Sequence, residues 1–195
     1  MLDNIPVLAT SAGVVALAEM GDKTQLLAFV LAARFRAPFA VMAGILLATL
    51  ANHALAAWAG MALASWLDSP AFRIAVALGF LAMAAWILVP DKLDDAEIKT
   101  PSPTTALGAL FATTVAFFIV EIGDKTQVAT MALAARYQSL WVVTAGTTLG
   151  MMLTNAPAVW LGDKLLAKLP LPLLRRLAAA LLAAVGLIAL WLALF

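Results

Sequence analysis

Long apolar runs separated by short polar stretches make up most of this chain. Each run is long enough to cross the roughly 30 Å hydrocarbon core of a bilayer, which takes about 20 helical residues. The runs do not alternate polar and apolar residues, so helices are favoured over the strands of a barrel. The pattern predicts six membrane-spanning helices, at residues 5–33, 39–66, 71–89, 104–135, 140–161 and 173–195.

Composition supports an all-α membrane protein. Of the 195 residues, 65% are hydrophobic and only 12% are charged, whereas soluble domains are about half apolar and a quarter charged. A net charge of +1 without a basic cluster gives no indication of nucleic-acid binding. The chain has no cysteine, which excludes disulfides, thiolate zinc sites and cysteine nucleophiles.

A seven-residue phrase occurs twice, at residues 19–25 and 121–127, and six of its seven positions are identical. The same shift of 102 residues (19 to 121) maps Gly44 onto Gly146, so the repeat extends beyond the phrase. Three spans in each half require the two halves to insert in opposite directions, as in many secondary transporters. The sequence therefore predicts two inverted three-helix repeats, 1–90 and 104–195, joined by an acidic linker at 91–103.

Lysine and arginine are distributed unevenly between the predicted loops. The side reached after spans one, three and five carries eight of them, and the opposite side carries only Arg73 and Arg136. The eight are Arg34, Arg36, Lys92, Lys99, Lys164, Lys168, Arg175 and Arg176. Because basic loops stay in the cytoplasm, we expect a cytoplasmic linker and both termini outside.

Each copy of the phrase carries two acids in an apolar run, where ionisable groups are costly and usually functional. On a continuous helix the two acids of a copy share one face, and antiparallel helices would bring all four to mid-bilayer. Carboxylates and neutral oxygens without sulfur or imidazole suit Mn²⁺, Ca²⁺ or Mg²⁺. We therefore predict a divalent cation site whose ligands are Glu19, Asp22, Glu121 and Asp124, with neutral oxygens from Thr24, Gln25, Thr126 and Gln127 nearby.

Two glycines in the phrase, Gly21 and Gly123, allow close helix approach and can loosen the helix so that carbonyl oxygens face an ion. Four clustered carboxylates cannot all remain ionised in an empty low-dielectric site. An empty site should therefore take up protons, and an arriving cation should expel them. Alternating exposure of such a site to the two sides of the membrane would exchange a divalent cation for protons.

The motif lysines allow a second interpretation. Glu19 with Lys23, and Glu121 with Lys125, have the i, i+4 spacing of helical ion pairs, which would be purely structural. That interpretation leaves Asp22 and Asp124 without partners, so a mixed role is favoured, in which the lysines hold a carboxylate when no ion is bound or lie at the mouth of the ion pathway.

Three polar residues of the second and fifth spans have open roles. His53 is the only histidine, and hydrogen-bonded helix packing is favoured for it over a proton relay. Asn52 and Asn155 either hold the cation ligands in place or join neighbouring helices.

The doubled Glu-x-Gly-Asp-Lys-Thr motif in a six-span inverted repeat resembles the Gdt family of cation/proton antiporters. The resemblance covers essentially the whole chain and implies exchange of Mn²⁺ or Ca²⁺ for protons, with Glu19, Asp22, Glu121 and Asp124 as the cation-binding acids. It implies a transporter, with no enzymatic activity or cofactor, similar to small bacterial manganese exporters. Eukaryotic members carry N-terminal targeting segments that this sequence lacks, which favours the plasma membrane of a prokaryote.

Two other classes of protein fit less well. An exporter of an organic cation or amino acid shares the inverted-repeat plan but would favour a roomier cavity with fewer carboxylates. An intramembrane aspartyl protease pairs two membrane aspartates, one of them in a Gly-x-Gly-Asp phrase. Here Glu19 and Glu121 replace the first glycine of that phrase, and a protease would not need an inverted duplication.

Overall fold

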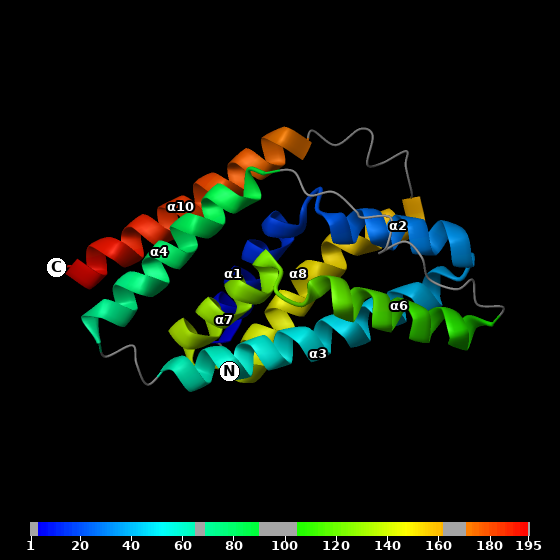
Figure 1. The fold of residues 1–195 in the computed structure, drawn as a ribbon, viewed down its shortest axis with the longest axis horizontal. Coiled ribbons are helices and arrows are strands. Elements are labelled where there is room, and N and C mark those ends of the chain that lie inside the picture. The colour runs from blue at the N-terminus through cyan, green and yellow to red at the C-terminus, as the bar shows by residue number, and fades with distance from the viewer. Residues whose placement is uncertain (1–3, 65–68, 90–104, 162–170, 195) are drawn as a thin grey trace.

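The computed structural model describes residues 4–64, 69–89, 105–161 and 171–194, which form eight helices and no strand. In chain order these are α1 (Asn4–Glu19), α2 (Lys23–Phe35), α3 (Pro38–Ala64), α4 (Pro70–Ile87), α6 (Ala106–Glu121), α7 (Lys125–Tyr137), α8 (Leu140–Leu161) and α10 (Leu171–Leu194) (Figure 1). The prediction of an all-helical protein is confirmed. The predicted linker at 91–103 lies outside the described residues, as do Lys92, Lys99, Lys164 and Lys168.

The first and fourth predicted spans are each broken in two at the repeated motif. Helices α1 and α2 meet at 76°, and α6 and α7 meet at 74°. Gly21 and Gly123 adopt φ values of 75° and 76°, a left-handed conformation that ends a helix and that glycine adopts without strain. The next residue in each copy, Asp22 or Asp124, then caps the following helix through its side chain. The prediction of a continuous helix through the motif is therefore wrong.

The length and apolar character of the helices indicate a multi-pass membrane protein. Three of them, at residues 38–63, 70–87 and 176–194, are long and apolar enough to cross a bilayer, and five spans result if each bent pair counts as one. The fifth predicted span forms α8 with the predicted bounds, but it is not among these candidates. Its buried threonines and asparagine, Thr144, Thr147, Thr148, Thr154 and Asn155, make α8 more polar than the other long helices.

The two halves of the chain repeat the same order of elements. Helices α1 to α4 correspond at the 102-residue shift to α6, α7, α8 and α10. An added Cβ at Gly44 on α3 would lie 2.7 Å from the carbonyl oxygen of Leu110 on α6. The repeat-related contact is the same, because an added Cβ at Gly146 on α8 would lie 2.7 Å from the carbonyl oxygen of Leu8 on α1. Glycine thus permits both long helices to cross the first helix of the other half closely.

The long helices α3 and α8 connect two apolar clusters. One cluster joins residues of α1, α7, α4 and α10, and the other joins residues of α2 and α6. Both clusters include residues of α3 and α8. The motif breaks lie where the first cluster gives way to the second.

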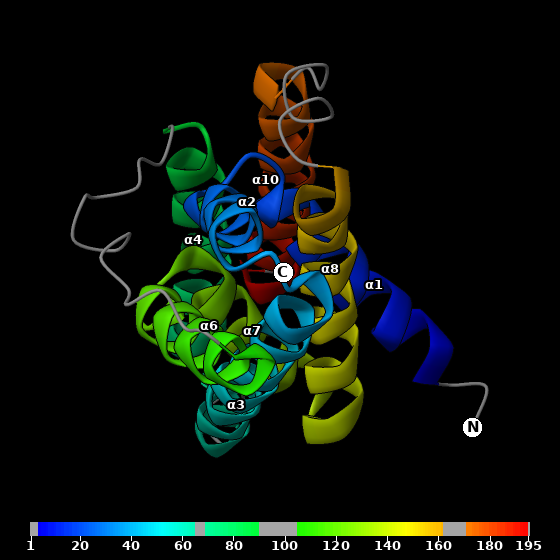
Figure 2. The ribbon, with the colours of Figure 1, turned by 90° about the vertical axis from the view of Figure 1, so that its right-hand side faces the viewer.

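The outer pair of helices makes the packing asymmetric. Helices α4 and α10 pack along each other and lie on the side of α1 and α7 (Figures 1 and 2). Helix α10 contacts α1 and α4 contacts α7, but among the described residues the repeat-related pairs α4–α6 and α10–α2 do not pack substantially. One sequence pattern is therefore present in two different packing environments.

Candidate cation site

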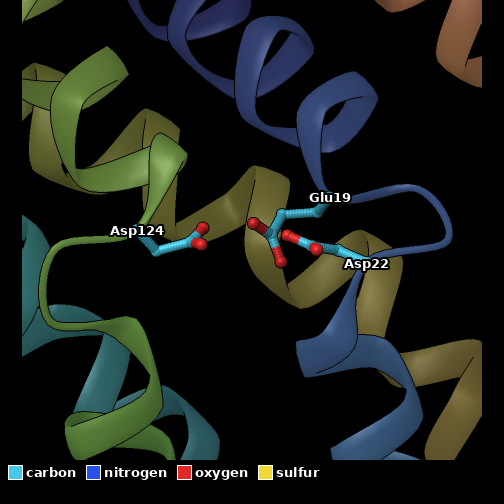
Figure 3. Close-up of side chains that lie close together, drawn as sticks. All are labelled: Glu19, Asp22 and Asp124. Atoms are coloured by element: carbon cyan, nitrogen blue, oxygen red, sulfur yellow. The ribbon is translucent and has the colours of Figure 1, made fainter. Parts of the chain in front are cut away.

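Three carboxylates of the repeated motif meet between the two helix breaks. Glu19 is the last residue of α1, Asp22 caps α2 and Asp124 caps α7. One oxygen from each of the three lies within 4.8 Å of the other two. Figure 3 shows the three side chains pointing toward one another from the two halves of the molecule. Acids of both repeats therefore come together, as predicted, at these three residues.

The fourth predicted acid, Glu121, does not join this group of three. It occupies the repeat-related place to Glu19, at the end of α6, and it is 1% exposed. Its Oε2 accepts a hydrogen bond from the Thr126 hydroxyl at 3.1 Å, and its Oε1 is buried without a partner. Glu19 has the same arrangement, with a hydrogen bond from the Thr24 hydroxyl to Oε2 and no partner at Oε1.

Threonine hydroxyls orient the acids in both copies. Thr24 and Thr126 are fully buried at the second position of α2 and α7. Thr126 also donates to Asp124 Oδ2 at 3.3 Å. A hydroxyl that donates its proton to one carboxylate oxygen leaves the other oxygen free to accept a cation or a proton. The hydroxyls thus hold the glutamates with one oxygen each directed away from the hydrogen bond.

The ion pairs at the site run between the two repeats. Lys125 Nζ lies 2.9 Å from Asp22 Oδ1, and Lys23 Nζ lies 3.7 Å from Asp124 Oδ1. Within the described residues, the ion pairs of the two lysines go to these aspartates, and not to Glu19 and Glu121 as the alternative interpretation with i, i+4 spacing required. The purely structural interpretation is not supported, because the break at the glycine removes the helical register that would have brought each lysine to the glutamate of its own copy.

The glutamines hold the breaks and do not direct oxygens into the group of three. Gln25 Oε1 accepts from the backbone N–H of Gly21 at 3.0 Å, and Gln127 Oε1 accepts from that of Gly123 at 2.9 Å. Gln25 Nε2 also donates to the carbonyl oxygen of Thr154 on α8 at 2.8 Å. Thr154 contributes only a main-chain atom to this contact, so no side-chain pattern in the sequence could have identified it.

The polar residues of α3 and α8 have different roles. Asn52 donates to the carbonyl oxygen of Phe118 at 3.1 Å and so joins α3 to α6. Asn155 donates to the carbonyl oxygen of Met151 at 3.0 Å, within its own helix. His53 is fully buried, and neither ring nitrogen has a hydrogen-bond partner. The prediction of hydrogen-bonded packing for His53 is therefore wrong.

The spacing of the three carboxylates suits a divalent cation. Two oxygens on opposite sides of a bound Ca²⁺ lie about 4.6–5.2 Å apart, twice the Ca–O distance. Separations within 4.8 Å therefore allow one ion to contact all three residues. Glu19, Asp22 and Asp124 are 0–4% exposed, so the carboxylates are buried inside the protein in this conformation.

Comparisons with known proteins agree with these features. A broken-helix membrane protein with carboxylates at facing breaks has the features of an ion transporter. The chain matches the divalent cation/proton antiporter GDT1 family over residues 7–95 and 109–194, and it belongs to that family. It is 49% identical over 178 residues to a Vibrio cholerae protein called "Putative manganese exporter". The aligned region covers 90% of this chain and 86% of that protein. No solved structure matches.

Proposed function

We propose that this protein exchanges a divalent cation, Mn²⁺ in preference to Ca²⁺, for protons, and that it exports Mn²⁺ from the cytoplasm of a prokaryote. The observation that carries the proposal is the meeting of Glu19, Asp22 and Asp124, buried and within 4.8 Å, from both halves of the chain. Hard oxygen ligands favour Mn²⁺, Ca²⁺ or Mg²⁺ over softer metals. The name of the Vibrio relative supports Mn²⁺.

Charge balance supports the coupling to protons. The four motif acids carry up to four negative charges, and the two motif lysines supply two positive charges. A divalent cation completes the balance, whereas without it the remaining charge is removed most simply by protons on the glutamates. The unpartnered oxygens of Glu19 and Glu121 are available for those protons. Binding of the cation then releases protons, and release of the cation takes them up.

The repeat supports alternating access. We propose six spans, with the two broken spans and α8 included, arranged as inverted repeats 1–90 and 104–195 about a cytoplasmic linker at 91–103. Inverted repeats with a site between them can open it to either side by exchanging their conformations. The pair α4–α10 lies against α1 and α7, and the opposite state would place this pair against the repeat-related helices α6 and α2.

The proposal is tested in proteoliposomes with an imposed pH gradient. Uptake of Mn²⁺, Ca²⁺ and Mg²⁺ is measured in parallel with the internal pH, using a metal-sensitive and a pH-sensitive dye. We expect Mn²⁺ uptake to be driven by the gradient and accompanied by proton movement in the opposite direction. D22N, D124N and E19Q should abolish both signals, while E97Q, in the predicted linker, should retain them. Mn²⁺ uptake that did not depend on the pH gradient, or that persisted in all three variants, would refute the proposal.

A further inference from the structure

The two motif lysines each neutralise the aspartate of the other repeat. Lys125 at the start of α7 pairs with Asp22 at the start of α2, and Lys23 pairs with Asp124 in the reverse sense. Both aspartates also belong to the group of three carboxylates. In the structure, the positive charges beside this group are therefore lysine side chains of the protein. Each lysine comes from one copy of the motif and pairs with the aspartate of the other copy.

The two pairs are unequal although their sequences are the same. The Lys125–Asp22 pair is short, at 2.9 Å, and the lysine side chain is 4% exposed. The Lys23–Asp124 pair is longer, at 3.7 Å, and the lysine side chain is 22% exposed. Both copies read Gly-Asp-Lys-Thr-Gln, so the difference arises from how the two halves are packed.

The packing difference follows the position of α4 and α10. These helices lie on α1 and α7 and make no comparable contact with α6 and α2 among the described residues. Repeat-related positions differ accordingly, since Ala135 on α7 is buried and its equivalent on α2, Ala33, is exposed. The tight lysine belongs to the covered helix, α7, and the loose lysine belongs to the uncovered helix, α2.

We propose that Lys23 and Lys125 are tethered substitutes for the transported cation, and that the tight and loose pairs exchange when the transporter changes state. The proposal rests on the exchange function proposed above. A cation that binds Asp22 must displace the ammonium of Lys125, because both compete for the same carboxylate and repel each other. In the opposite state, Lys23 becomes the tight partner of Asp124 and Lys125 becomes the loose one.

A purely structural role for the lysines predicts something else. If Lys125 served only to hold α7 to α2, its removal would loosen the carboxylates and weaken cation binding. If Lys125 competes with the cation, its removal strengthens binding. The sign of the change in affinity therefore separates the two roles.

The first experiment measures Mn²⁺ affinity of purified protein by calorimetry. We expect K125Q to bind Mn²⁺ on the order of tenfold more tightly than the wild type, because a competing unit charge close to the ion is removed. K125R keeps the charge and should return the affinity toward the wild-type value. R176Q removes one exposed positive charge from α10 and serves as the matched control, with unchanged affinity. Weaker binding by K125Q would overturn the proposal.

The second experiment follows conformation without any metal, so it remains informative even if Mn²⁺ is not the substrate. The chain has no cysteine, so A33C and A135C each introduce a single thiol at repeat-related positions. In the wild-type background we expect a water-soluble maleimide to label A33C faster than A135C. K125Q, which removes the tight pair, should speed labelling of A135C and slow that of A33C, and K23Q should not.

The outcome of the labelling is decisive in either direction. Opposite shifts in K125Q and an unshifted or reversed pattern in K23Q support the exchange of tight and loose pairs. Equal effects of the two substitutions, or no effect of either, would overturn it. Failure of this test with intact Mn²⁺ exchange would leave the proposed function standing, and loss of Mn²⁺ exchange with intact shifts would affect only the choice of substrate.

Discussion

Lys125 Nζ lies 2.9 Å from Asp22 Oδ1, so the shortest ion pair at the site joins residues that occupy neighbouring positions of the same motif in different repeats. Such a pair forms only when the two halves of the chain are assembled. It couples the formation of the carboxylate group to the packing of one repeat on the other.

Gln25 and Gln127 should differ in their importance for stability. Gln25 is buried and bridges the Gly21 backbone to α8, whereas the half-buried side chain of Gln127 accepts a hydrogen bond from Gly123 and has no second side-chain hydrogen bond within the described residues. We expect Q25L to lower the free energy of unfolding by about 2–3 kcal/mol, because two buried hydrogen bonds are lost, and Q127L to lower it by about 1 kcal/mol. Thermal unfolding in detergent compares the two. Equal losses would show that the contact with Thr154 contributes nothing.

Gly123 should be required for its backbone conformation and not for space. It has φ +76°, and an added Cβ there would meet no atom within 4 Å. G123A should therefore cost about 1–2 kcal/mol from left-handed backbone strain alone. Gly13 also has open space but lies inside α1, so G13A should be neutral or stabilising by up to about 1 kcal/mol. The unfolding temperatures of the two variants check this, and a G123A protein as stable as G13A would contradict it.

Gly60 should be required for close approach of backbones. An added Cβ would lie 2.1 Å from the carbonyl oxygen of Met131, which forces α3 away from α7. We expect G60A to destabilise the protein by about 3 kcal/mol or to prevent folding, because the obstacle is main chain and cannot rotate away. G79A, at a site with nothing within 4 Å, is the control. Fluorescence-detected size exclusion after heating compares the thermal stability of the two variants, and a G60A protein as stable as G79A would disprove the close crossing.

Thr24 should act through its hydroxyl. It donates to Glu19, and that hydrogen bond fixes the side chain beside the other two carboxylates. T24V preserves the shape but removes the donor, so we expect cation affinity to fall roughly tenfold, the equivalent of about 1.4 kcal/mol. T24S retains the hydroxyl and should restore most of the affinity. Metal titration of the three proteins is the measurement, and equal affinities for T24V and T24S would exclude the role.

Part of this arrangement could be predicted from the sequence. The 102-residue repeat predicted that Gly44 and Gly146 occupy equivalent places, and each does permit a close helix crossing. The long apolar runs were sufficient to predict the helices, because lipid leaves few other ways to satisfy the backbone of a spanning segment. The doubled acidic motif indicated the site because charged groups at membrane depth are rarely without function.

Other features depended on tertiary packing. The glycine–aspartate step at each motif is a helix stop followed by a helix start, but the apolar residues on both sides suggested one continuous span. The break also removes the i, i+4 partners that the alternative interpretation gave to Lys23 and Lys125, since that spacing has meaning only within a helix. The inequality of the two lysine pairs was beyond any sequence pattern, because identical residues occupy both positions and only the placement of α4 and α10 distinguishes them.

Helices α4 and α10 should separate from the rest of the molecule together when the protein partly unfolds. These helices pack mainly on each other and meet the remaining helices through α1 and α7. Amide hydrogens of both should therefore become exchangeable together, as one cooperative unit that opens at a lower free energy than the crossed helices beneath it. A detergent or lipid that separates this unit would leave the other six described helices together, with every carboxylate of the motif among them.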